Sequence, residues 1–380
     1  MSKPNVKINI LSPGRFHVCD LARELDKNGF DVKFYSFVPT RRAVKFGLPK
    51  HCSKSVIGIM APFLLLERAI FKHSKWPRVL RVIVQDYITS IYMRRCDICI
   101  AMSGSFLFAT KRAKKQGAIV ILERGSKHIL EQKRILGHIK EIQPQANTVP
   151  DINVKRELEG YKIADYIAIP SEHVKLSFEK HHYPLEKLFT NPYGVDVSMF
   201  YHQKDSRKKY DLIMVGGWSL RKGCDLIIKA VTKMNLKLIH VGSIVDIPFP
   251  QSSNFVHIDS VNQSKLIEFY NMAKIFILPS REEGLAMVQV QAIACNLPIV
   301  GSPDSGAADL KKIVEYPKYI TIINDYSENA VCKAIKKSLS NYKDTEEIQY
   351  AGAAIQNLTW EAYGRRYTQF LNTIIEQNGI

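Results

Sequence analysis

The sequence lacks any apolar segment long enough to cross a bilayer. Its longest apolar run, Val56 to Leu66, falls short of the ~20 residues that a membrane-spanning helix needs. The start, Met1 to Pro4, contains no apolar core of a signal peptide and leads directly into a predicted strand. Tracts rich in proline, glycine and serine are also missing, and the composition is that of a globular protein. We therefore expect a folded, cytoplasmic protein.

Cysteine is scarce and shows no disulfide pattern. The seven cysteines are odd in number and scattered, which indicates reduced thiols. Cys96 and Cys99 form a C-x-x-C pair, but they lie in a buried-strand pattern and no second pair completes a zinc site. We interpret both as core cysteines.

Acidic residues are few in the first half of the chain. Residues 1–150 hold 27 lysines and arginines against 10 aspartates and glutamates, whereas residues 151–380 hold 27 against 26. This asymmetry predicts an anionic partner for the first half, such as a membrane surface, a lipid-linked acceptor, an acidic glycan or nucleic acid. A basic face that meets only solvent is the alternative. No nucleic-acid-binding module is recognisable, so we expect no nucleic acid partner.

Residues 40–95 combine positive charge with an apolar centre. Basic residues flank the apolar run on both sides, and Trp76 lies among those that follow it. This pattern fits attachment to an anionic membrane surface, peripheral and at the inner face of the membrane. A buried pair of helices with a basic outer face fits almost as well.

Strand-like and helix-like patterns alternate along the first half. Residues 6–11 have the pattern of a strand, a helix with one apolar face follows, and residues 31–37 form the next strand. This order opens a doubly wound parallel α/β sheet. Gly14 allows a tight turn after the first strand. A later strand, residues 117–124, leads into His128.

Sequence signals divide the chain near residue 196. The N-P and Y-G steps within residues 191–196 break regular structure, and a polar run follows at residues 202–209. A chain of 380 residues also exceeds the size of a single core, so two domains are expected.

The second domain begins with a strand, residues 210–215, that ends in glycines. The loop that follows places Arg221 and Lys222 ahead of Gly223 and a helix. Cations in a glycine-containing loop before a helix are typical of diphosphate binding. A pair of solvated charges at a helix start is the alternative.

The most informative stretch runs from Pro279 to Cys295. It follows an apolar strand at residues 274–278, and neither glycine nor proline interrupts residues 285–295, so that strand, tight loop and helix succeed one another. The free backbone N–H groups at such a helix start favour a phosphate or diphosphate. Ser280 and Glu283 also have the spacing of a capping box, which needs no ligand.

The stretch from Pro279 to Val300 resembles the signature of retaining nucleotide-sugar glycosyltransferases, the glycosyl transferases group 1 family. This resemblance implies an α/β fold with two Rossmann-like doubly wound domains facing a cleft, the GT-B fold. Residues 1–196 would bind the acceptor and residues 197–359 the nucleotide sugar. A helix at residues 360–380 would cross back to the first domain.

The resemblance also implies roles for residues of this stretch. The family's first carboxylate touches donor-sugar hydroxyls and its second holds the ribose, which correspond here to Glu283 and Gln291. Glutamine replaces the usual glutamate, and its amide oxygen can still accept a hydrogen bond from a ribose hydroxyl. The helix start that binds the diphosphate corresponds to Gly284, Leu285 and Ala286.

Further implied residues lie in other loops. Lys222 would bind the donor diphosphate, and Arg221 would replace an arginine that the family carries at the position of Gly217. His128 matches a histidine that contacts the donor sugar and lines the reaction centre, and packing at a loop-to-helix junction is the alternative. The cleft loop of the first domain corresponds to Gly14 and Arg15.

The function implied is transfer of a sugar from a UDP- or GDP-sugar to an acceptor hydroxyl, with retention, in the synthesis of surface polysaccharide, lipopolysaccharide or glycolipid. The partners would be this donor and a glycan or lipid-linked acceptor. No D-x-D motif is seen, so we expect neither a metal nor a cofactor. Two alternatives stay open: a nucleotide-sugar epimerase of the same fold, and a non-catalytic or donor-impaired homologue that acts as a binding protein.

Overall fold

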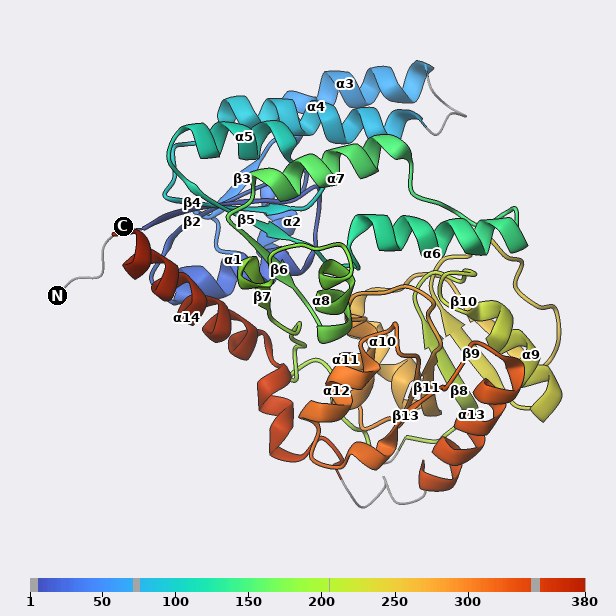
Figure 1. The fold of residues 1–380 in the computed structure, drawn as a ribbon. Coiled ribbons are helices and arrows are strands. Elements are labelled where there is room, and N and C mark those ends of the chain that lie inside the picture. The colour runs from blue at the N-terminus through green and yellow to red at the C-terminus, as the bar shows by residue number, and fades with distance from the viewer. Residues whose placement is uncertain (1–5, 71–75, 205, 343–348, 380) are drawn as a thin grey trace.

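The computed structural model describes residues 6–70, 76–204, 206–342 and 349–379, with side chains throughout except at 64–70 and 76–78. The chain forms two α/β domains, each built on a parallel sheet (Figure 1). This confirms the predicted class of two Rossmann-like, doubly wound domains. The side chain of Trp76, which we predicted to contact a membrane, lies outside the description.

The first sheet has seven strands in the order β3-β2-β1-β4-β5-β6-β7. They are β1 (Lys7–Leu11), β2 (Asp31–Ser36), β3 (Ser53–Ser55), β4 (Ile98–Met102), β5 (Ile119–Glu123), β6 (Tyr166–Ile169) and β7 (Leu188–Thr190). The central strands are apolar and buried on both faces, as a parallel sheet between helices requires. Because all pairs are parallel, the carboxyl ends of the strands meet at one edge.

Helices pack against both faces of this sheet. They are α1 (His17–Lys27), α2 (Thr40–Lys45), α3 (Ile57–Ile70), α4 (Trp76–Tyr92), α5 (Leu107–Lys115), α6 (Ile129–Ile142), α7 (Asp151–Ile163) and α8 (Glu172–Glu179). Helices α3 and α4 contact each other (Figure 1). Within the described ranges, no helix has both the length and the hydropathy of a membrane span.

The second sheet has the order β10-β9-β8-β11-β12-β13. Its strands are β8 (Tyr210–Val215), β9 (Leu238–Val241), β10 (Phe255–Ile258), β11 (Ala273–Leu278), β12 (Ile299–Gly301) and β13 (Ile320–Ile322). Its helices are α9 (Cys224–Met234), α10 (Gln263–Asn271), α11 (Met287–Ala294), α12 (Ala307–Ile313) and α13 (Glu328–Tyr342). Short 3₁₀ helices lie at Leu185–Lys187, Pro317–Tyr319 and Gly352–Leu358.

The last helix, α14 (Trp360–Asn378), leaves the second domain and packs along α1 of the first (Figure 1). Gly364 permits the close approach, because a Cβ there would overlap the Cβ of Glu24. Further along, the hydroxyl of Tyr367 donates a 2.7 Å hydrogen bond to Glu123 at the end of β5.

The chain thus passes between the domains twice, and the two passages lie side by side. The N–H of Val195 in the first passage donates to the carbonyl oxygen of Leu358 in the second at 2.8 Å. Gly194 fits closely there, because a Cβ on it would overlap the backbone of Thr359 and Trp360.

Candidate functional site

Two loops of the second domain converge at the carboxyl edge of its sheet. Residues 216–223 follow β8, and residues 279–286 follow β11, the strand that pairs with β8. Gly223 has a φ of 74°, and a Cβ on it would overlap the carbonyl oxygen of Pro279. The lysine loop (residues 216–223) and the glycine corner (residues 279–286) therefore lie against each other at this edge of the sheet.

Glu283 of the glycine corner is held by cations of the lysine loop. Its carboxylate forms an ion pair with Lys222, and a guanidinium nitrogen of Arg221 lies 3.7 Å away. Burial acts to raise the pKa of Glu283, but the positive charges of Lys222 and Arg221 outweigh it and hold the pKa below its ordinary value. The carboxylate is therefore ionised at neutral pH and neutralises the cations predicted to bind a diphosphate.

A carboxylate that the family pattern does not mark lies next to Glu283. Glu282 is fully buried and accepts hydrogen bonds from Ser126 Oγ and from Gln132 Nε2, the latter at 3.1 Å. Both donors belong to the first domain. The guanidinium of Arg221 lies 3.1 Å from the same carboxylate. Glu282 therefore connects the lysine loop to the first domain. In the sequence, only its position next to Glu283 could have pointed to it.

The first domain covers the glycine corner closely. A Cβ on Gly284 would overlap the carbonyl oxygen of Gly125. Ser171 Oγ donates a 3.0 Å hydrogen bond to the carbonyl oxygen of Gly284. The two domains are therefore in a closed arrangement at this point.

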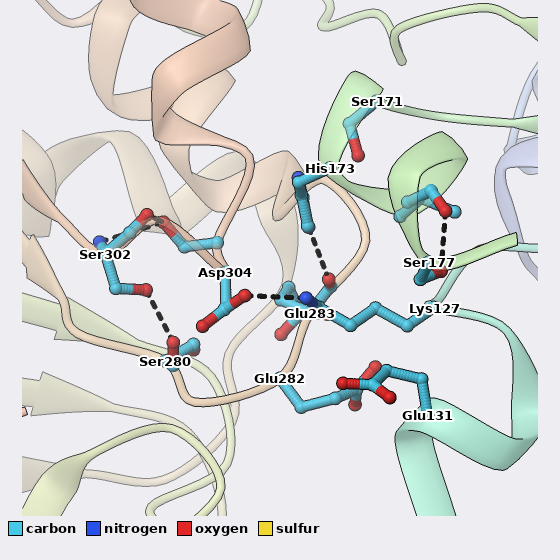
Figure 2. A network of polar contacts seen from close by, with 12 residues as sticks. Lys127, Glu131, Ser171, His173, Ser177, Ser280, Glu282, Glu283, Ser302 and Asp304 are labelled. Carbon is cyan, nitrogen blue, oxygen red and sulfur yellow. Dashed lines mark hydrogen bonds and ion pairs between the residues drawn. The ribbon is translucent and has the colours of Figure 1, made fainter. Parts of the chain in front are cut away.

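Side chains of the first domain also reach into the second (Figure 2). A ring nitrogen of His173 lies 2.9 Å from the carbonyl oxygen of Glu283, and Lys127 extends to Asp304 with a 2.6 Å ion pair. These contacts fix the backbone of the glycine corner and the turn after β12 relative to the first domain.

Helix α11 begins at the glycine corner without a side-chain cap. Its N-cap is Ala286, and Ser280 Oγ has no hydrogen-bond partner in the described part of the chain, so the capping-box alternative is wrong. The N–H of Ala286 donates to the carbonyl oxygen of Ser305 at 3.4 Å. Leu285 and Ala286 are both buried. The helix start is therefore covered in the closed arrangement, and its binding of a diphosphate stays a prediction.

Open space lies beside α11, in a cavity between the domains of about 900 Å³. Its lining includes Arg15 and His17 from the first domain and Gln263, Met287 and Gln291 from the second. Arg15 donates a 2.9 Å hydrogen bond to Gln263 across the cleft. The volume is that of a pocket for a nucleotide-sized ligand.

The predicted residues therefore fall into separate groups. Arg15 and Gln291 line this interdomain cavity. Arg221, Lys222 and Glu283 form the ion-paired cluster and are outside the lining.

Gln291 is fixed at the wall of the cavity. The hydroxyl of Tyr270 donates to its amide oxygen at 2.9 Å and also lies 3.1 Å from the carbonyl oxygen of Val288. Gln291 is buried, and its amide oxygen is held by this contact. Its predicted contact with a ribose stays a prediction.

Gly217 is closely packed, whereas a Cβ on Gly14 would meet only Phe16 at 3.7 Å, an ordinary contact, so the tight turn predicted at Gly14 is wrong. A Cβ on Gly217 would meet Val245 Cγ2 at 2.9 Å, so the arginine of the family would require Val245 to move. Gly14 lies after β1, where Ser12 Oγ donates to its carbonyl oxygen at 2.7 Å.

His128 caps α6 from within the first domain. Its Nδ1 accepts a 3.4 Å hydrogen bond from the N–H of Leu130, and its ring packs 4.4 Å from that of His181 and 4.9 Å from that of Phe178. Burial, together with the neighbouring charges of His181 and Arg124, lowers the pKa of His128 to about 3. The ring is neutral near pH 7 and is not part of the cavity lining, so its catalytic role stays a prediction.

We expect His128→Asn to reduce acid destabilisation of the fold. Because the folded-state pKa of about 3 lies below the ordinary 6.5, the unfolded chain binds more protons between these values, and the folded state loses stability as the pH falls. Between pH 7 and pH 5 the loss is ~2 kcal/mol. Asparagine keeps a capping oxygen but does not titrate. Urea unfolding at both pH values measures the effect, and an equal pH dependence of both proteins would contradict it.

One group of described residues has the ligand atoms for a metal ion. Asp26, His51 and Cys52 bring a carboxylate oxygen, a ring nitrogen and a sulfur within 4.8 Å of one another. They lie at the end of α1 and before β3, and none of them lines the interdomain cavity. We assign them no part in the site.

Comparison with known proteins shows what the second domain is similar to. Residues 199–354 match the family model described as "Glycosyl transferases group 1". The probable sucrose-phosphate synthase of Thermosipho melanesiensis is 23% identical over 60% of this chain and 58% of that protein. The GDP-mannose-dependent alpha-(1-6)-phosphatidylinositol monomannoside mannosyltransferase of Mycolicibacterium smegmatis is 23% identical over 55% and 62%. The matched part thus covers less than two thirds of either relative.

A solved structure supports the assignment of the fold. Anabaena HepE, solved in complex with UDP-glucose, resembles this chain with a TM-score of 0.64 and 13% identity, over 97% of this chain and 100% of that one. Such a likeness shows the fold, and it extends over both domains.

Proposed function

Because residues 199–354 match the glycosyl transferases group 1 family model and the chain has the GT-B fold, we propose that it transfers a sugar from a UDP- or GDP-sugar to an acceptor hydroxyl. We include retention of the anomeric configuration in this proposal, and a place in the synthesis of surface polysaccharide, lipopolysaccharide or glycolipid. One relative is named as GDP-mannose-dependent, and HepE was solved with UDP-glucose.

The observation that carries the proposal is the meeting of Lys222, Arg221 and Glu283 at adjacent strand ends. Fixed cations are what a diphosphate needs, and a carboxylate is what sugar hydroxyls need. In the donor complex the diphosphate would replace Glu283 on Lys222, and the released carboxylate would turn to the sugar. The cations would then neutralise the charge that develops on the leaving nucleoside diphosphate, without a metal ion.

The interdomain cavity supports a placement for the remaining parts of the substrates. We propose that the nucleoside lies against Gln291 and that the acceptor approaches from the side of Arg15 and Gly14. Closure of the first domain over Gly284 would exclude water, whose attack would hydrolyse the donor.

A thermal-shift screen tests the proposal. UDP, GDP, dTDP and their nucleotide sugars are added to the full chain one at a time. At least one nucleoside diphosphate is expected to raise the Tm. At a concentration 100 times its Kd, the gain in unfolding free energy is ~2.7 kcal/mol. If none of the nucleotides raises the Tm, the proposal is overturned.

We expect Glu283→Gln to separate nucleotide binding from transfer. The substitution removes the negative charge that neutralises Lys222, so UDP or GDP should bind ~10-fold more tightly, a gain of ~1.4 kcal/mol. Transfer should fall ~100-fold, because the contact with the sugar is lost. Titration calorimetry and release of the nucleoside diphosphate from the donor measure the two effects.

A matched control for this variant is Glu328→Gln. Glu328 pairs with Lys233 at 2.8 Å on the surface of α13, outside the cavity lining. Glu328→Gln should leave both nucleotide binding and transfer unchanged. Weaker nucleotide binding by Glu283→Gln would count against the exchange of Glu283 for a diphosphate.

We propose further that the protein works at the inner face of a membrane, with a glycan or lipid-linked acceptor held by its basic first domain. Support comes from the excess of positive charge in residues 1–150 and from Tyr87, Ile91 and Tyr92, which are exposed on α4. Sedimentation with vesicles of phosphatidylglycerol or of phosphatidylcholine tests this. Binding to the anionic vesicles alone is expected, and binding to neither would overturn it.

A second candidate is a donor-impaired homologue that acts as a binding protein. The observations that favour it are Gln291 in place of a glutamate and the pairing of Lys222 with Glu283. Under this alternative, nucleotides would stabilise the protein, but no donor would be turned over.

A further inference from the structure

Asp26, His51 and Cys52 bring three kinds of metal ligand together at one edge of the first domain. Asp26 lies in the last turn of α1, and the other two lie in the turn that leads into β3. Their carboxylate oxygen, ring nitrogen and sulfur all lie within 4.8 Å of one another. None of the three lines the interdomain cavity, and they have no part in the proposed transfer.

One carboxylate oxygen of Asp26 is the point where the other two side chains meet. Nε2 of His51 lies 2.7 Å from this oxygen, Oδ1, and Cys52 Sγ donates to the same oxygen at 3.2 Å. Two ligand atoms of a tetrahedral zinc site lie ~3.3–3.6 Å apart. Shifts of ~0.3–0.6 Å in these contacts therefore make room for an ion between the three atoms.

The position of Asp26 at the end of α1 favours a cation. The last carbonyl groups of a helix carry partial negative charge, and the carboxylate of Asp26 adds to it. Within the described ranges, the only basic side chain that pairs with Asp26 is His51. The nearby Lys33 is directed elsewhere, since its Nζ lies 3.2 Å from the carbonyl oxygen of His51 and 3.4 Å from Asp31. Neither lysine nor arginine thus neutralises this helix end in the described structure.

The backbone holds the turn that carries two of the ligands. The N–H of Cys52 donates to the carbonyl oxygen of Pro49 at 3.0 Å, and the carbonyl oxygen of Cys52 accepts from the N–H of Phe34 at 2.8 Å. Cys52 is fully buried, whereas the side chain of His51 is 63% exposed. The three ligand atoms are therefore held on ordered backbone, and the side of His51 is open to solvent.

We propose that Asp26, His51 and Cys52 bind one Zn²⁺ ion, with a water molecule as its fourth ligand. Sulfur and imidazole nitrogen are ligands of zinc, whereas Mg²⁺ and Ca²⁺ take oxygen ligands. Without the ion, burial and the neighbouring Asp26 raise the pKa of Cys52 to about 12, so the thiol is protonated. Zn²⁺ replaces this proton on the sulfur, and the proton passes to solvent. His51 binds through Nε2 and carries its ring proton on Nδ1.

The ion joins the end of α1 to an edge of the first sheet. Strand β3 has three residues and pairs with β2 alone, so few backbone hydrogen bonds hold it. From β3 the chain continues into α3 and α4. Zn²⁺ therefore stabilises the segment from which this pair of helices begins.

The zinc content of the full chain tests the proposal. The protein is stripped with a chelator under a phosphine reductant, equilibrated with zinc chloride and gel-filtered, and one zinc ion per chain is expected by atomic emission. His51→Ala and Cys52→Ser are each expected to weaken zinc binding at least ~10-fold, the cost usual even for residues that only support a ligand. His51 is exposed, so its alanine variant keeps the test available if Cys52→Ser does not fold.

Cobalt identifies the sulfur ligand. Co²⁺ added to the stripped wild type is expected to give the absorption band of charge transfer from a thiolate, and Cys52→Ser should lose it. Two control variants should keep the band and the zinc content. His138→Ala removes a surface histidine that pairs with Glu141 at 3.4 Å, and Cys332→Ser removes a half-buried thiol of α13.

Three outcomes would overturn the proposal. The first is a wild type that retains no zinc. The second is equal retention by His51→Ala and Cys52→Ser, which would show adventitious binding only. The third concerns hydrogen exchange, because zinc is expected to slow the exchange of the backbone amides of residues 49–55. Unchanged exchange there, with one zinc ion bound per chain, would place the ion elsewhere.

Discussion

Replacing Lys222 with alanine is expected to remove most of the stabilisation by any nucleoside diphosphate and to weaken the fold itself. Lys222 is the cation paired with Glu283 and the one predicted to bind the diphosphate. Losing a charge-assisted contact should weaken UDP or GDP binding ~30-fold, which is ~2 kcal/mol. Thermal shift and calorimetry measure the loss.

The same substitution leaves Glu283 with one fewer positive neighbour. Removal of one partner of a buried ion pair costs ~3 kcal/mol, and the pair is largely shielded, with side chains 12% and 16% exposed. Because the pKa of Glu283 is held below its ordinary value, its contribution to stability is present above that ordinary value and is lost as the pH falls through the folded-state pKa. The variant's stability should therefore depend less on pH in acid than that of the wild type.

Two control variants test whether these effects are specific to the charge of Lys222. Lys222→Arg keeps the charge and should retain part of the nucleotide response. Lys233→Ala removes a lysine that pairs with Glu328 on the surface, and it should leave the unfolding free energy almost unchanged, because solvent screens an exposed ion pair. If Lys222→Ala binds UDP and GDP as the wild type does, the lysine loop is not the diphosphate site.

Gly284→Ala is expected to hold the two domains apart. A Cβ at this position overlaps the carbonyl oxygen of Gly125, which is backbone and cannot rotate away. Gly284 does not have a left-handed φ, so alanine suits its own backbone and the effect arises from the contact alone. Small-angle scattering should show a larger radius of gyration, and turnover of the donor should fall ~100-fold as closure is lost.

Gly137→Ala is the control for this variant. Gly137 lies within α6, where a Cβ would meet nothing within 4 Å, and alanine there should stabilise the helix by ~0.5–1 kcal/mol. An unchanged radius of gyration for Gly284→Ala would mean that the close contact at Gly125 adjusts without opening the domains.

The fold and the converging corners were predictable because their signals are local. Apolar runs such as residues 274–278 mark buried strands, and the glycines at their ends mark the loops. The order of strand, loop and helix then assigns Lys222 and Glu283 to one edge of a parallel sheet. That step needs topology but no knowledge of side-chain packing.

What escaped prediction depends on contacts between distant segments. Glu282 matters because Ser126 and Gln132 of the other domain bind it, and no spacing in the sequence encodes that contact. The contact between His17 and Glu123 could not be predicted, since the two residues are over a hundred positions apart in the sequence. His128 follows the predicted strand, but its ring packs inside the domain against Phe178 of α8, a contact that the sequence does not reveal.

The paired passages at Val195 and Leu358 restrict how the lobes can move. A single connecting segment would allow the second domain to rotate in any direction. Two segments joined by a hydrogen bond resist twisting, so the easiest motion is a hinge bend about the line that passes through both. Opening should therefore follow a clamshell path that widens most at the rim farthest from this line and least beside it. A substrate would enter from the rim. A disulfide engineered across the rim would hold the two domains closed without changing the paired connecting segments.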